Sequence, residues 1–177
     1  MFLFRHPTRK QRILEPVWGR FLYYACPGRY QGSAICFESR SIGPLRWSKS
    51  VDPERSRELE RLRRDGHRVV QTKRSLEIHC TAESIRTTVL FRTALHEVGH
   101  YVDWQQSVLN VDGATEEEEE RLRRAFDTKT SVMKEDFAHR YAAITAAKLT
   151  DSGQLPFELQ WDAGAMGSCG ISRHWFV

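Results

Sequence analysis

Residues 96–100 read His-Glu-Val-Gly-His, and this short pattern constrains the chain more than any other feature of its sequence. On an α-helix, residues four apart lie one above the other on the same face, so His96 and His100 would bind one metal ion together. Glu97 lies about 100° further round the helix, within reach of a water on that metal without being a ligand itself. In this arrangement two histidines bind zinc and the intervening glutamate acts as general base.

The surrounding residues indicate that the motif lies on a helix. Residues 84–107 contain no proline, and their apolar side chains recur at helical spacing. Thr81 fits the N-cap position. Gly99 would cost about 1 kcal/mol in a helix interior relative to alanine, so we expect it to allow close packing. The alternative interpretation is an ordinary amphipathic helix with two histidines facing solvent.

A second segment is needed to complete such a site, because a catalytic zinc usually takes three protein ligands and leaves its fourth position to water. An extended version of the motif would place a glycine at position 103 and a histidine at position 106, but this chain has Asp103 and Gln106 there. The remaining option is a carboxylate on another helix. Residues 131–150 are predicted to form one, and they carry Glu135 and Asp136.

Helical phase divides residues 131–150 into two faces. One face is an apolar stripe that we expect to be buried against the core, made of Met133, Phe137, Tyr141 and Ile144. The opposite face carries Glu135 together with Ala138, His139, Ala142 and Ala146. Small side chains let two helices approach to near the short end of the usual ~8–10 Å spacing. This predicts Glu135 as the third ligand, with Asp136 and His139 as the alternatives.

The two segments together resemble the gluzincin metallopeptidases, and within them the group that includes the anthrax lethal factor catalytic domain. In that group the active-site helix reads His-Glu-x-Gly-His-x-x-Asp and the glutamate helix reads Glu-x-Phe-Ala-Glu-x-Phe/Tyr, as residues 96–103 and 135–141 largely do. The resemblance implies zinc bound by three ligands, with a glutamate as general base. Those residues are His96, His100 and Glu135 as ligands and Glu97 as base. It also implies that Asp103 supports a ligand histidine without binding the metal itself.

The chain departs from this family pattern at two places. His139 stands where the glutamate helix has its second glutamate, and residues 127–130 lack the tyrosine or histidine that related enzymes use to stabilise the oxyanion. His139 and Tyr141 are therefore candidate helpers. Tyr101 and His174 are further options that spacing does not separate.

The resemblance implies a small zincin-like α+β domain, in which a short mixed sheet accompanies an active-site helix and a glutamate helix. Its implied activity is zinc-dependent hydrolysis of peptide bonds, with a peptide or protein substrate lying along a sheet edge. Alternating or β-branched runs predict strands at residues 33–37, 68–72 and 76–80, and we expect one of them to form that edge. His79 is predicted to be a strand-surface residue rather than a ligand.

The length and composition fit one domain, since 40% of the 177 residues are hydrophobic. We expect a basic, poorly packed arm at residues 1–20, the metallopeptidase-like domain at 21–150, and a tail at 151–177 that docks partly on the domain. The tail contains Trp161, Trp175 and Phe176. If it reaches the metal, Cys169 or His174 would act as a temporary ligand that keeps the enzyme latent.

Two charged segments have an ordinary structural interpretation. Asp52 and Gly66 bracket a predicted helix whose arginines and glutamates fall at i,i+3 or i,i+4 spacing. Residues 116–120 are all glutamate and open another helix that ends near Arg123 and Arg124, which suits the helix dipole. With a net charge of only +4, nucleic acid is a possible but less favoured partner.

The sequence predicts a cytoplasmic chain without a membrane partner. No apolar run approaches the roughly 18 residues that span a bilayer, and the N-terminus has its apolar piece before its basic residues, the reverse of a secretory signal. The four cysteines lack paired spacing and are predicted to be buried free thiols. The alternative functions are a DNA-associated or regulatory zinc protease, and a non-catalytic zinc-binding domain.

Overall fold

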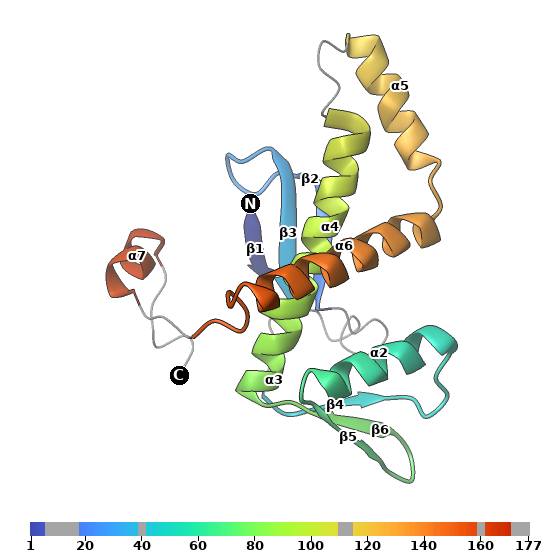
Figure 1. The fold of residues 1–177 in the computed structure, drawn as a ribbon, viewed down its shortest axis with the longest axis vertical. Coiled ribbons are helices and arrows are strands. Elements are labelled where there is room, and N and C mark those ends of the chain that lie inside the picture. The colour runs from blue at the N-terminus through green and yellow to red at the C-terminus, as the bar shows by residue number, and fades with distance from the viewer. Residues whose placement is uncertain (6–17, 39–41, 110–114, 159–161, 171–177) are drawn as a thin grey trace.

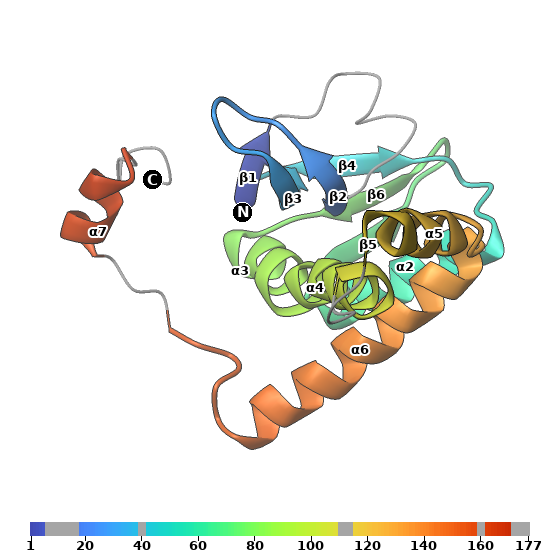
Figure 2. The ribbon, with the colours of Figure 1, turned by 90° about the horizontal axis from the view of Figure 1, so that it is seen from above.

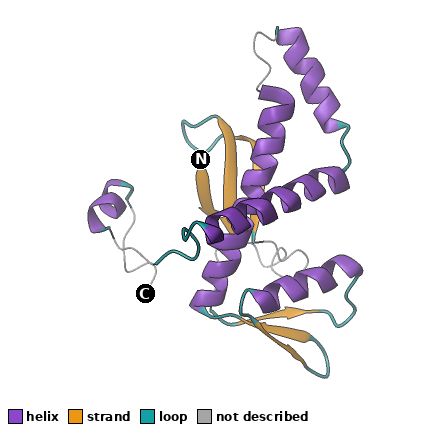
Figure 3. Ribbon diagram, in the orientation of Figure 1, coloured by secondary structure: helices purple, strands orange, loops and turns teal. Residues whose placement is uncertain are grey.

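The computed structural model describes residues 1–5, 18–38, 42–109, 115–158 and 162–170, and its architecture is α+β (Figures 1 and 3). The described strands are β1 (Phe2–Arg5), β2 (Gly19–Ala25), β3 (Gly32–Glu38), β4 (Pro44–Trp47), β5 (Arg68–Gln71) and β6 (Leu76–His79). The described α-helices are α2 (Pro53–Arg64), α3 (Ala82–Arg86), α4 (Ala94–Trp104), α5 (Glu116–Asp127), α6 (Ser131–Asp151) and α7 (Ala163–Ser168).

The strands form two small sheets where the sequence predicted a single mixed one. The first has the order β1-β3-β2, with β1 parallel and β2 antiparallel to β3, and is therefore mixed. The second has the order β4-β6-β5 and is antiparallel throughout. The predicted strands at 33–37, 68–72 and 76–80 are confirmed as β3, β5 and β6, whereas β1, β2 and β4 were not predicted.

The motif lies on one long helix that runs from α3 to Leu109 through two π-helical stretches, Thr87–Thr93 and Gln105–Leu109. The predicted cap is confirmed, because the Thr81 side chain accepts a hydrogen bond from the Ser84 amide and the Ser84 side chain accepts one from the Thr81 amide. Its α4 portion lies between the first sheet and α6, as the view from above shows (Figure 2). The central helix therefore has one face on β2 and one on α6.

Two groups of buried side chains hold these elements together. The larger one packs α2 against the second sheet and comprises Trp18, Trp47, Leu59, Leu62, Leu76, Ile78 and Cys80. The smaller one joins the end of the long helix to α5 and comprises Trp104, Val108 and Phe126, with Phe21 and Tyr23 of β2 packed against it. The long helix contacts both groups, because Ile85 and Val89 pack against the first and Trp104 and Val108 belong to the second.

The expectation of a poorly packed arm at residues 1–20 is wrong for its described parts. β1 pairs along its whole length with β3, and Trp18 is only 5% exposed within the larger core. The buried indole and the parallel pairing give both ends of this segment fixed partners. Residues 6–17 lie outside the described part of the chain.

The apolar stripe predicted to bury α6 does not face the core. Met133 and Ile144 are 58% and 51% exposed, whereas Ala138 on the opposite face is fully buried. The helix turns its small residues inward because only they fit the short distance to α4. The predicted close approach of the two helices through alanines is thus confirmed, whereas the predicted burial of the stripe is wrong at Met133 and Ile144, and Phe137 and Tyr141 are half-buried.

The charged helices match their ordinary interpretation. Asp52 caps α2 through a hydrogen bond to the Arg55 amide, and arginine–glutamate pairs such as Arg63–Glu60 line the helix. On α5, Arg123 and Arg124 pair with glutamates four residues earlier, although the helix continues to Asp127. These arginines therefore pair with acidic residues of their own helices.

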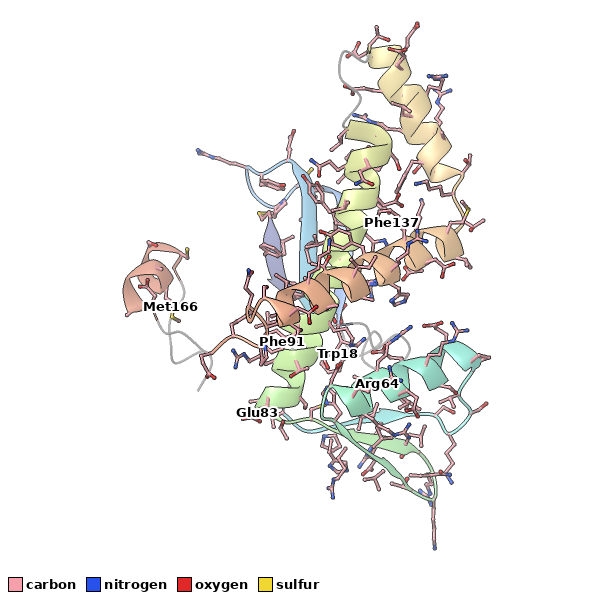
Figure 4. The ribbon with its side chains drawn as sticks, viewed as in Figure 1. Trp18, Arg64, Glu83, Phe91, Phe137 and Met166 are labelled. Carbon is pink, nitrogen blue, oxygen red and sulfur yellow. The ribbon has the colours of Figure 1, made fainter. Side chains whose placement is uncertain are left out.

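The described part of the C-terminal segment contacts the domain through Phe157. The Phe157 ring packs edge-on against Phe91 at 5.0 Å between ring centroids, and Arg86 donates a hydrogen bond to the Phe157 carbonyl. Beyond it, α7 stands away from the rest of the molecule in both ribbon views, and Met166 lies well apart from Trp18 and Phe91 (Figure 4). Trp161, Trp175, Phe176 and His174 lie outside the described residues.

The state of the cysteines and the length of the helices are two further features of the fold. All four cysteines are free, as predicted, but only Cys36 and Cys80 are buried, while Cys26 and Cys169 are exposed. No helix in the described part of the chain is long and apolar enough to cross a membrane.

One buried histidine should make the stability of this fold depend on pH. His67 is 3% exposed, with its Nδ1 3.0 Å from Ser84 Oγ and its Nε2 2.9 Å from Thr88 Oγ1. Burial lowers the pKa of His67 below its ordinary value of 6.5, against the opposing effect of Asp65. The unfolded chain therefore binds this proton at a higher pH than the folded chain does, and folding loses stability as the pH falls below 6.5.

We expect His67→Gln to flatten this pH dependence. Urea denaturation at pH 7.5 and pH 5.5 would measure it, with the loss in the wild type bounded by about 1.4 kcal/mol per pH unit. His79→Gln is the matched control, since His79 lies on the surface of β6 with its side chain 34% exposed. An equal drop in the free energy of unfolding for wild type and His67→Gln would contradict the assignment.

Candidate metal centre

The two motif histidines face one another at the surface of α4. Four residues apart on a regular helix, they project in the same direction, and their Nε2 atoms lie 3.2 Å apart. Their side chains are 16% and 10% exposed for His96 and His100. Two nitrogens this close leave room for one proton at most between them, or for a shared metal ion.

Glu135 of α6 completes the group. Its Oε2 lies 3.2 Å from His96 Nε2 and its Oε1 lies 3.4 Å from His100 Nε2. Hydrogen bonds from His100 and His96 lower the pKa of Glu135 far below its ordinary range, so it is a carboxylate. Two atoms bound to a tetrahedral zinc at about 2.0–2.1 Å are about 3.3–3.4 Å apart. The two imidazole nitrogens thus already lie at ligand-like separations from one another and from the oxygens of the Glu135 carboxylate.

The packing of α4 on α6 sets these distances. A Cβ atom on Gly99 would lie 2.9 Å from the Ala138 Cα and 3.0 Å from the Ala138 carbonyl oxygen, closer than real Cβ atoms come to backbone. Only a glycine at this position allows the two backbones to touch. The predicted packing role of Gly99 is therefore confirmed, and it brings Glu135 onto the histidine face.

Glu97 lies beside the three donors in the position expected of a proton acceptor. It is 5% exposed and belongs to the wall of the same cavity as His96 and His100. Burial raises the pKa of Glu97 above its ordinary value, while the two histidines act in the opposite direction. A carboxyl whose pKa is moved toward neutrality is a better general base than an ordinary surface glutamate.

Gly19 is a site residue that the sequence did not reveal. A Cβ atom there would lie 2.7 Å from Thr93 Cγ2 and 3.3 Å from Glu97 Cγ. The glycine therefore lets β2 run directly against the motif helix beside Glu97. A single glycine ahead of an aromatic run gives no local signal of this approach.

The donors open into a cavity of about 940 Å³. Its walls come from β2, α2, the long helix and α6, and among the lining residues are Arg20, Phe21, Tyr23, Glu54, Glu58, Arg61, Phe91, Ser131 and Ala142. The edge strand along this cavity is β2, not one of the three predicted strands, because β3 has partners on both sides and β5 and β6 lie in the second sheet. The wall formed by α2 was not predicted either, since the spacing of its charged residues indicated only ion pairs within the helix.

His139 also reaches the site. Ligand atoms of His96, Glu135 and His139 all lie within 4.8 Å of one another, and the His96 and His139 rings are 4.5 Å apart between centroids. Two sets of three donors therefore share His96 and Glu135, one completed by His100 and the other by His139. The separations of 3.2–3.4 Å that His100 makes with His96 and Glu135 make it the better third member. Asp136 is not among the cavity-lining residues.

The remaining predicted helpers lie elsewhere. Asp103 Oδ1 accepts hydrogen bonds from Lys129 Nζ at 2.7 Å and Ser107 Oγ at 3.3 Å, and the described residues include no hydrogen bond from either motif histidine to it. Tyr101 packs against Phe21, and neither it nor Tyr141 lines the cavity. Of the predicted helpers that the structure describes, His139 alone is therefore at the site, while His174 lies outside the described residues. The described residues therefore show no hydrogen bond by which Asp103 would support a ligand histidine.

Comparison with protein-family models, with curated proteins and with solved structures finds no match to this chain. The chemistry of the site therefore has to follow from the chain's own residues.

Proposed function

We propose that this chain is a zinc-dependent peptidase of gluzincin-like design, with His96, His100 and Glu135 as metal ligands and Glu97 as general base. The observation that supports it best is the set of separations among the two imidazole Nε2 atoms and the Glu135 carboxylate: the nitrogens are 3.2 Å apart, and each lies 3.2 or 3.4 Å from one oxygen of Glu135, as at a tetrahedral zinc site. The donor set of two imidazoles and one carboxylate is also that of catalytic rather than structural zinc sites.

Zinc bound there would lower the pKa of a coordinated water toward neutrality and polarise the scissile carbonyl. Glu97 accepts the proton of the attacking water and passes it to the leaving amine. Its burial supports this role, because burial raises the pKa of Glu97 and so makes its carboxylate a stronger proton acceptor. Gly19 keeps the space next to Glu97 free of a side chain.

The substrate is an extended peptide that pairs with the exposed edge of β2. This strand is an outer strand of its sheet, and Gly19, Arg20, Phe21 and Tyr23 all border the cavity that contains the donors. Among the described strands none pairs with the outer side of β2, and the outer strand of a sheet offers backbone hydrogen bonds to another extended chain. The peptide would then cross the cavity in front of Glu97.

A specific observation favours the non-catalytic alternative as a second candidate. His139 lies close enough to supply a fourth donor, and structural zinc sites close all four positions with protein ligands. The two candidates differ in whether zinc in this chain supports turnover.

Cleavage of a peptide library tests the proposal. We expect the zinc-loaded chain to cut peptides, to lose this activity when a chelator removes the metal, and to regain it when zinc is added back. His100→Ala is expected to be inactive, while the surface variant His79→Ala keeps wild-type activity. Mass spectrometry of the products would record the cleavage. Cleavage that survives both chelation and His100→Ala would contradict the proposal.

A further inference from the structure

His139 occupies a position on α6 that directs it to the metal centre. It follows Glu135 by four residues and so lies on the same helix face. Its neighbour Ala138 is the residue whose backbone touches Gly99 of α4. The contact that fixes the distance between the two helices is therefore one residue away from His139, and the placement of its imidazole depends on the same packing as that of Glu135.

His139 lies close to two of the three proposed ligands, His96 and Glu135. Its ligand nitrogen is within 4.8 Å of donor atoms of both His96 and Glu135, and its ring is tilted by 45° to the His96 ring at 4.5 Å between centroids. A side chain that merely bordered the cavity would not have to approach two donors at once. Two ligands on one zinc are roughly 3.3–3.4 Å apart, and metal binding would draw the imidazole to that separation.

The imidazole of His139 is also available for coordination. Neither ring nitrogen has a hydrogen-bond partner among the described residues, and the side chain is half-buried in the cavity wall. An imidazole nitrogen that makes no other hydrogen bond can bind a metal ion through its lone pair.

We infer that His139 is a fourth protein ligand at this centre, joining His96, His100 and Glu135 in the resting protein. The inference rests on the metal site of the proposed function. With four protein ligands the centre is closed, so the imidazole of His139 has to leave before water can take its place. In this account His139 holds the site closed until substrate enters.

X-ray absorption at the zinc edge counts the imidazoles directly and needs no substrate. The full chain loaded with zinc alone would be measured as wild type, His139→Ala and His79→Ala. We expect three imidazoles in the wild type, two in His139→Ala and three in His79→Ala, which alters a surface histidine of β6. His139→Gln, which keeps a polar side chain, serves as a second variant and should also give two.

Zinc affinity and turnover provide the second readout. Loss of His139 should raise the Kd for zinc by roughly 10- to 100-fold, in the range seen when a supporting group is removed. It should also raise kcat for peptide cleavage, because water no longer competes with the imidazole. Two imidazoles in both the wild type and His139→Ala, with tight zinc binding, would overturn the assignment of His139 alone. Failure of the wild type to bind zinc would overturn the proposed function as well.

Discussion

Replacing Glu97 by glutamine should lower kcat for peptide cleavage by roughly 10²- to 10⁴-fold, the usual contribution of a general acid–base group. The amide has nearly the same shape but cannot accept the proton of the attacking water. Zinc binding should be unchanged, because Glu97 supplies none of the atoms of His96, His100 and Glu135 that lie 3.2–3.4 Å apart at the site. Kinetics with a cleaved peptide, together with zinc content, would measure both effects.

Glu54→Gln is the matched control for this variant. Glu54 lines the same cavity from α2, but its side chain is 61% exposed and pairs with Arg57 and Arg61. Its amide should leave kcat within a small factor of the wild type. Equal activity of Glu97→Gln and wild type would remove Glu97 from the reaction, even if zinc and cleavage were both present.

Replacing Gly99 by valine should destabilise the fold by about 3 kcal/mol, at the upper end of the usual cost of overpacking. The new Cβ would meet the Ala138 Cα at 2.9 Å and its carbonyl oxygen at 3.0 Å, and these are backbone atoms that move only if α6 moves. Displacing α6 carries Glu135 away from the two histidines. Zinc should therefore stabilise Gly99→Val less than it stabilises the wild type.

Urea denaturation with and without zinc measures both parts of this prediction. Gly167→Val is the control, because Gly167 lies on α7 with no atom within 4 Å of where its Cβ would be. The free energy of unfolding of that variant should stay within about 0.5 kcal/mol of the wild type, as for most exposed substitutions. If Gly99→Val is as stable as Gly167→Val, then the two helices do not depend on this contact.

The local parts of this structure could be predicted from the sequence because they depend on neighbouring residues. Thr81 and Asp52 cap their helices as predicted, since a cap needs only its own side chain and an amide three residues on. The spacing of His96 and His100 fixes their common direction in the same way. Helical phase also placed Glu135 on the correct face of α6, because small residues mark the face that packs closely.

The parts that were missed depend on packing between distant segments. β2 has no alternation of buried and exposed residues, because one side meets the motif helix and its edge meets the cavity. Its sequence therefore lacks the alternation of apolar and polar residues that would have indicated a strand. The apolar stripe of α6 was predicted to be buried, but the contact of Gly99 with Ala138 turns Met133 and Ile144 outward. The α2 wall of the cavity and the contact partners of Asp103 depend on the same long-range packing.

Elemental analysis of the purified chain tests the central claim most directly. We predict stoichiometric zinc in the wild type, its loss in His96→Ala and Glu135→Ala, and its retention in Asp136→Ala, which removes the neighbouring carboxylate outside the cavity. Zinc absent from the wild type, or retained in Glu135→Ala and lost in Asp136→Ala, would contradict the account.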